Sequence, residues 1–169
     1  MKFETMFLEL VDSTEMIRSL TAGITQAEAQ VKPSPDSWSI LETVCHLCDE
    51  ERDDFRRRLE IILHRPTEKW PPIAPQEWVR ARKYNEQDFK KMKERFLSER
   101  GKSLDWLKGQ SDASWDMAYA SDLGLMSAGD MLASWIAHDN LALRQLVELR
   151  RWRIERIATP YNIAYAGDW

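Results

Sequence analysis

The spacing of apolar side chains along the chain predicts amphipathic helices. In residues 3–22 the apolar positions recur every three or four residues, as they do on the buried stripe of a helix. This stripe consists of Phe3, Phe7, Leu10, Val11, Thr14, Ile17 and Leu20. Gly23 ends the predicted helix. Ser39 and Glu42 then match the capping-box pattern that opens a helix, and we expect this second helix to run to about Leu63.

Two further helices follow in the second half of the chain. An apolar stripe predicts a third helix from about Glu86 to Leu107. After a loop over residues 115–124, the Ser127–Asp130 segment resembles another helix start, and we expect the fourth helix to reach about Arg151. Pro160 excludes its continuation.

The segment between the second and third helices is rich in proline and aromatic residues. Residues 65–84 contain four prolines together with Trp70, Trp78 and Tyr84, which predicts a long ordered crossover rather than a flexible linker. No internal repeat or strand pattern competes with the helices. The sequence therefore predicts an all-α fold, a four-helix bundle with a long crossover between helices 2 and 3, formed by residues 1–169 as a single domain.

Composition narrows the class of protein. Hydrophobic residues make up 43% and charged residues 31% of the 169, which is ordinary for a soluble globular protein. No apolar run approaches the roughly 20 residues of a membrane span, and the net charge of −4 disfavours nucleic acid as a partner. The N-terminal residues lack the pattern of a signal peptide, and the two cysteines suit a reducing compartment. We expect a cytoplasmic protein.

Two histidines lie within predicted helices and are candidates for chemistry. On a helical wheel His46 falls roughly 160° from Val44, among polar residues that include Glu50, so it reads either as part of a solvated face or as a metal ligand. His138 lies at the edge of an apolar stripe, where a packed, hydrogen-bonded histidine is the more common alternative to a ligand. Spacing alone leaves both alternatives open for each residue.

Other sequence features give weaker evidence for a functional site. Cys45 and Cys48 flank His46, but no second cysteine pair completes a structural zinc site, and a redox pair would follow a strand. We interpret both cysteines as small buried hydrophobic residues. The eight tryptophans are dispersed, and no glycine-rich phosphate loop or nucleophile elbow is present. The catalytic residues stay unknown at this level.

Several segments together resemble the DinB-like superfamily of four-helix-bundle proteins, which includes YfiT-like metalloenzymes. The resemblance covers nearly the whole chain in the right order: Trp38-Ser39-Ile40, His46-Leu47, Pro71-Pro72-Ile73, Trp78-Val79, Arg82-Lys83-Tyr84-Asn85, Gly124, Ala137-His138-Asp139 and Gln145. Many members of that family carry nickel or zinc on three histidines, one on the second helix and an H-x-x-x-H pair on the fourth.

Only two of those three histidines are present here. The family pattern falls on His46, His138 and Ala142, and alanine supplies no lone pair. Glu50, one turn beyond His46, would offer an oxygen in place of the missing nitrogen, unless it faces solvent as most helical glutamates do. We therefore expect a metal site formed by His46, His138 and Glu50, with nickel or zinc bound weakly or absent.

The resemblance implies two classes of function. The first is a metal-dependent thiol S-transferase or hydrolase acting on a small molecule, with a low-molecular-weight thiol as a further partner in the transferase case. The second is a non-catalytic module that keeps the family cleft for a small molecule or a protein without metal. Family analogy also predicts a homodimer.

Overall fold

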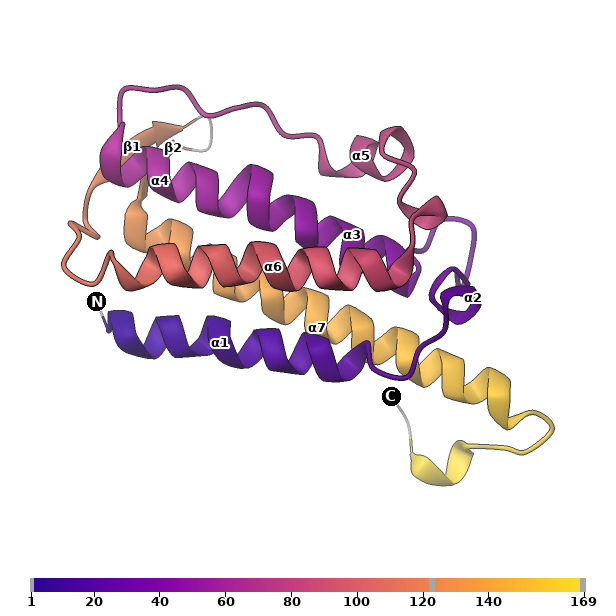
Figure 1. Ribbon diagram of the computed structural model, residues 1–169. Coiled ribbons are helices and arrows are strands. Elements are labelled where there is room, and N and C mark those ends of the chain that lie inside the picture. Colours follow the sequence, from indigo (N-terminus) through magenta and orange to yellow (C-terminus); the bar gives the residue numbers. More distant parts are fainter. Residues whose placement is uncertain (1, 122–123, 168–169) are drawn as a thin grey trace.

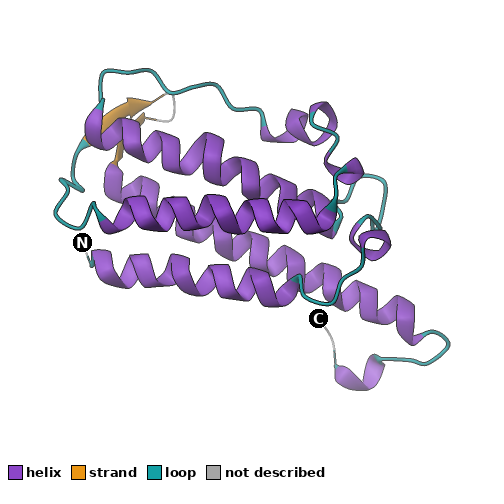
Figure 2. Ribbon diagram, in the orientation of Figure 1, coloured by secondary structure: helices purple, strands orange, loops and turns teal. Residues whose placement is uncertain are grey.

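Four long helical stretches dominate the computed structural model, which describes residues 2–121 and 124–167 (Figures 1 and 2). The first is α1, Phe3–Leu20. The second consists of α3 (Ile40–Asp49), a π-helix (Glu50–Phe55) and α4 (Arg56–His64) in succession. The third is α6, Phe89–Lys108, and the fourth is α7, Ala128–Ala158. The predicted all-α bundle is confirmed.

Side-chain caps fix where these helices begin. The Ser39 hydroxyl accepts a hydrogen bond from the Glu42 amide at 3.1 Å, while the Glu42 carboxylate accepts one from the Ser39 amide at 2.8 Å. Ser127 and Asp130 form the same capping box at the start of α7. Each box satisfies two amides that a helix N-terminus leaves unpaired. Both predicted helix starts are therefore confirmed, whereas α7 runs seven residues beyond its predicted end at Arg151.

The crossover is ordered and contains short helices. A four-residue helix, α2 (Gln26–Ala29), precedes the second long helix, and the crossover itself holds α5 (Pro75–Ala81) and a 3₁₀ turn (Tyr84–Glu86). Trp70 stacks on Tyr119 with ring centroids 4.5 Å apart, and Trp78 packs against the core. These aromatic contacts hold the crossover along α3 and α4 (Figure 1).

A β-hairpin contradicts the prediction of a loop over residues 115–124. Strands β1 (Ala118–Ser121) and β2 (Gly124–Ser127) pair antiparallel, with Ala118 opposite Ser127. The strands are only four residues long, so their alternation is too short to stand out in sequence. Tyr119 anchors the hairpin in the core, where it is 7% exposed.

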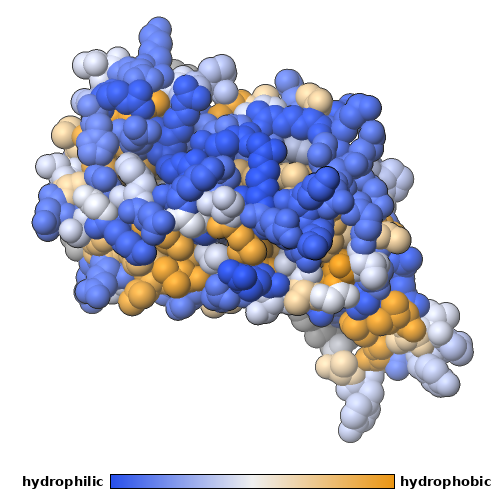
Figure 3. Space-filling view, viewed as in Figure 1, coloured by the Kyte–Doolittle hydropathy of each residue, from blue (hydrophilic) through white to orange (hydrophobic). Residues whose placement is uncertain are grey.

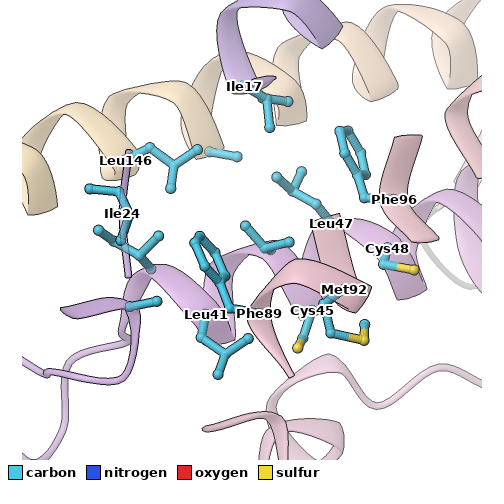
Figure 4. Close-up of a cluster of buried hydrophobic side chains, with 14 of the residues drawn as sticks. Ile17, Ile24, Leu41, Cys45, Leu47, Cys48, Phe89, Met92, Phe96 and Leu146 are labelled. Carbon is cyan, nitrogen blue, oxygen red and sulfur yellow. The ribbon is translucent and has the colours of Figure 1, made fainter. Parts of the chain in front are cut away.

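The core consists of two hydrophobic clusters along the bundle. Figure 4 shows the first, in which Ile17, Leu47 and Phe96 from three different helices point toward one another. The second lies at the other end, around Leu59, Leu107 and Trp135. On the face seen in Figure 3 the surface is mainly hydrophilic, with apolar areas over α1 and near the end of α7. None of the helices in residues 2–121 and 124–167 combines the length and apolar character needed to cross a membrane.

Candidate metal centre

Packing of α3 against α7 brings the two candidate histidines together. His46 lies two turns after the Ser39 cap, and His138 lies three turns after the Ser127 cap. Their Nε2 atoms are 3.2 Å apart and form a hydrogen bond, as the packed, hydrogen-bonded alternative for His138 expects. Two nitrogens bound at about 2.0–2.1 Å to one tetrahedral zinc ion lie about 3.3 Å apart, so the observed separation fits two ligands of a single ion.

Glu50 completes a group of three donors. It is the first residue of the π-helix, and its Oε1 atom lies 3.7 Å from His46 Nδ1, beyond hydrogen-bonding distance. One donor atom each from His46, Glu50 and His138 lies within 4.8 Å of the others. The three residues predicted from sequence thus meet at one place. π-helical segments occur often at functional sites, because the extra residue per turn redirects side chains.

Of the two alternatives for His46, the solvated polar face is wrong. Glu50 is only 4% exposed and Thr43 is fully buried, whereas the His46 side chain is 12% exposed. All the other residues from 40 to 51 are buried, because α3 is enclosed by α6, α7 and the crossover. A helix that is covered on every side has no solvent face, so its polar residues mark internal contacts.

Burial keeps both imidazoles neutral. Loss of water, together with the neighbouring His138, lowers the pKa of His46 to about 3. Burial also lowers the pKa of His138. At neutral pH each ring therefore has a nitrogen lone pair, which is the form that binds a metal.

Burial shifts the pKa of Glu50 upward, opposite to the shift for the histidines. Loss of water and the nearby Asp54 carboxyl raise the pKa of Glu50 to about 8. Asp54 in turn pairs with Arg58 at 2.7 Å. A cation beside Glu50 would favour the ionised carboxylate that the other neighbours disfavour.

Two polar atoms of the group lack partners. His46 Nδ1 and Glu50 Oε1 are both buried without a hydrogen-bond partner among the described residues. Buried polar atoms are satisfied in the great majority of cases, so the unsatisfied Glu50 Oε1 calls for an explanation such as a bound ion. One imidazole binds an ion through one nitrogen only, so an ion held by His46 Nε2 would leave its Nδ1 atom without a partner. The donor set of two nitrogens and one carboxylate oxygen suits zinc or nickel.

Aromatic side chains surround the histidines. The Trp38 ring meets His46 edge-on with centroids 4.8 Å apart, and Phe55 lies 5.1 Å from His138. Phe55 also stacks on Trp135 at 5.8 Å. These rings restrict the orientations of both imidazoles and shield them from bulk water.

A buried ionic network that sequence reasoning missed lies directly behind the histidines. The Arg100 guanidinium of α6 donates to Asp139 at 2.7 and 2.9 Å and to Glu51 at 2.9 Å. Trp135 Nε1 donates to the other oxygen of Glu51, and Ser13 of α1 donates to Asp139. The only sequence signal was that the two acids adjoin Glu50 and His138. The network fixes the backbone next to both ligands.

The remaining candidates from sequence lie apart from this chemistry. Ala142 is 6% exposed and lies one turn beyond His138, as expected for the position of the missing ligand. Cys45 and Cys48 are free and fully buried, which confirms their interpretation as core residues. Burial raises the pKa values of these thiols to about 12 and about 11, so neither is reactive near neutral pH.

Comparison with known proteins gives one family and one fold. The model of the DinB superfamily matches residues 9–146. A solved structure with a TM-score of 0.78, covering 90% of this chain and 87% of its own at 14% identity, is YfiT from Bacillus subtilis. That protein is described as a probable metal-dependent hydrolase with an unusual four-helix bundle topology. No curated protein matches the sequence.

Proposed function

The chain belongs to the DinB superfamily, and we propose that it is a metal-dependent hydrolase of a small molecule, with the metal held by His46, His138 and Glu50. The observation that carries the proposal is the convergence of three donor groups within 4.8 Å, two half-buried imidazoles and the buried Glu50, whose Oε1 atom has no hydrogen-bond partner among the described residues. Geometry of this kind is costly in an apolar interior unless a ligand compensates for it.

The residues around the centre have separable tasks. A divalent ion held there would supply a Lewis acid that polarises a substrate bond and acidifies water. His46 and His138 present neutral lone pairs because burial keeps them unprotonated. Glu50 supplies the oxygen that replaces the missing third histidine. Trp38 and Phe55 hold the imidazoles in place and limit the access of bulk water.

Two other functions remain to be distinguished from the hydrolase. A thiol S-transferase would use the same ligands but would need a low-molecular-weight thiol to turn over an electrophile. A non-catalytic module would bind neither zinc nor nickel. We favour the hydrolase because the described residues already enclose the donors, and because the fold is that of YfiT, whose description names a probable hydrolase.

The test compares zinc-loaded, nickel-loaded and metal-free protein on a panel of nitrophenyl esters and nitroanilides. We expect hydrolysis only with metal, and its loss in His46→Ala and His138→Ala. His64→Ala is the matched control, because His64 is exposed and lies at the far end of α4. Hydrolysis that survives removal of metal or of His138 would refute the proposal. Metal-dependent turnover that requires an added thiol would instead support the transferase.

A further inference from the structure

A groove of about 720 Å³ opens beside the metal centre. It lies between the segment that precedes α3 and the C-terminal half of α7. Its lining includes Asp36, Trp38, Gln145, Glu148, Arg151 and Trp152. None of these residues is a proposed metal ligand.

The groove and the metal centre share one wall. Trp38 lines the groove and also contacts the His46 ring, so the two sites are separated by a single indole. On α7, His138, Gln145 and Trp152 are spaced seven residues apart and so lie on one face of the helix. Ala142 occupies the same face between His138 and Gln145 and contributes only a methyl group. The groove therefore runs along the same face of α7 that carries His138.

The chemistry of the lining is aromatic and acidic. Two indoles, Trp38 and Trp152, face a set of carboxylates that outnumbers the basic groups. The lining holds three carboxylates (Asp36, Glu148 and Glu155) and one guanidinium, Arg151, which pairs with Glu155 at 2.5 Å. The lining therefore carries a net charge of −2.

The two remaining carboxylates are open to a ligand. Within the described part of the chain, Asp36 has no ion-pair or hydrogen-bond partner on its side chain. Glu148 lies 3.5 Å from Arg144, but both side chains are at least half exposed, so solvent screens this pair. The Trp152 indole forms a cation–π contact with Arg156, whose guanidinium lies 4.7 Å from the ring centroid, so this ring is able to bind a cation.

We propose that the groove binds an organic cation, a small amine or quaternary ammonium compound with an apolar body. Carboxylates attract the positive group, and indole faces bind both cations and apolar surface. That this cation is the substrate of the metal centre rests on the proposed hydrolase function, whereas binding to the groove does not.

Binding is tested in metal-free protein with three probes of similar shape. Calorimetry or NMR titration compares phenethylamine, phenethyl alcohol and hydrocinnamate, which are cationic, neutral and anionic. We expect the amine to bind at least about fivefold more tightly than the alcohol at low salt, with hydrocinnamate the weakest, and the gap to narrow in concentrated salt. Equal affinity for the three probes would overturn the proposal.

Charge variants place the effect in the groove. Asp36→Asn combined with Glu148→Gln keeps the shape of both side chains and should bring the amine and the alcohol to within about twofold of each other. Glu9→Gln combined with Asp12→Asn, on the exposed face of α1, is the matched control and should leave the preference intact. A preference that survives in the groove variant, or that falls equally in the control, would show that the cation binds elsewhere.

The substrate assignment is tested separately on the zinc-loaded enzyme. With acetylcholine and its uncharged isostere dimethylbutyl acetate, the Asp36→Asn/Glu148→Gln variant should raise KM for the ammonium ester at least about fivefold, leave kcat unchanged and spare the neutral ester. An unchanged KM for acetylcholine would overturn the substrate assignment. Cation binding without any zinc binding would refute the hydrolase proposal and support cation binding in the groove. Zinc binding without a preference for the cation would support the metal site and refute cation binding in the groove.

Discussion

At the scale of single residues, the proposed metal centre depends on donors that are already close together without a ligand. His46 and His138 are held neutral, and Glu50 is held close to them by the start of the π-helix. Such preorganisation reduces the conformational cost of binding an ion. Ala142 is the position at which the site falls short of three histidines.

We expect Ala142→His to raise affinity for zinc or nickel by at least about tenfold, or ~1.4 kcal/mol. The new imidazole would lie one turn beyond His138 on the same helical face. The larger side chain replaces a buried methyl group, so the free energy of unfolding should fall by roughly 1–3 kcal/mol. Calorimetric titration of the folded variant measures the affinity. An intact fold with unchanged affinity would show that position 142 does not face the ion.

Glu50 should make the stability of metal-free protein depend on pH. Its pKa rises from 4.5 to about 8 on folding, so between these values the folded state keeps a proton that the unfolded state has released. Stability therefore falls as pH rises from about 5 to about 8. Glu50→Gln should remove this loss. The free energy of unfolding of the variant, compared with that of wild type, should therefore be at least about 1 kcal/mol more favourable at pH 8 than at pH 5.

Urea unfolding at the two pH values measures this effect. Glu9→Gln, an exposed substitution on α1, is the control and should leave the pH dependence of wild type. If Glu50→Gln shows the same pH dependence as wild type, Glu50 is ionised in the folded protein and the burial argument fails. His46 acts in the acid range with the opposite sign, because its pKa is lowered and the unfolded state gains a proton below about pH 6.5.

At the scale of elements, α6 supplies no candidate ligand but holds in register the helices that carry the proposed ligands. Its Arg100 side chain is 1% exposed and bonds to α1, α7 and the π-helix. The carboxylates of Glu51 and Asp139 are equally buried and depend on this one cation.

Arg100→Met should therefore destabilise the protein by about 3–5 kcal/mol, because it leaves two buried carboxylates uncompensated. Chemical denaturation measures the loss. Adding Glu51→Gln and Asp139→Asn to the variant should recover part of it, since both anions are then removed. A triple variant no more stable than Arg100→Met would mean that packing, and not charge, accounts for the cost.

The helices could be predicted from sequence where local chemistry decides them. The capping residues Ser39 and Ser127 act within one turn, so both helix starts were predicted correctly. The hairpin at Ala118–Ser127 was not, because its strands are short and its stability comes from Tyr119 in the core. The π-helix was missed because α3 is covered on every side, so the phase shift caused by one inserted residue displaces no clear apolar stripe.

The site was predictable only in part for a related reason. His46, His138 and Glu50 were identified with the help of the family resemblance, and the structure brings them together. The solvent-facing alternative for Glu50 is wrong, because it assumes that the helix has one open side, as most helices do. The Arg100 network depends on contacts between residues up to 126 positions apart, which no local pattern encodes.

At the scale of the whole molecule, the last turns of α7 and the segment just after it carry exposed apolar side chains. Ile154, Ile157 and Tyr161 are 44%, 58% and 82% exposed. Exposed apolar side chains are found at many interfaces between proteins. The homodimer expected from family analogy remains a prediction, and this surface is our candidate for its contact.

Light scattering over micromolar concentrations tests this expectation. We expect a dimer for the wild type and a monomer for Ile154→Glu combined with Ile157→Glu, because buried charges at an interface cost several kcal/mol. Leu8→Glu, an exposed apolar site on α1, is the matched control and should stay dimeric. A wild type that is monomeric at all of these concentrations would contradict the homodimer prediction.

The most direct test of the central claim is a calorimetric titration of zinc and nickel into metal-free protein. We predict one ion per chain for the wild type and for His64→Ala, bound more weakly than by Ala142→His. Binding should be lost in His46→Ala and His138→Ala and weakened at least about tenfold in Glu50→Ala. A wild type that binds neither ion, or full binding by His46→Ala or His138→Ala, would contradict the metal centre described for this bundle.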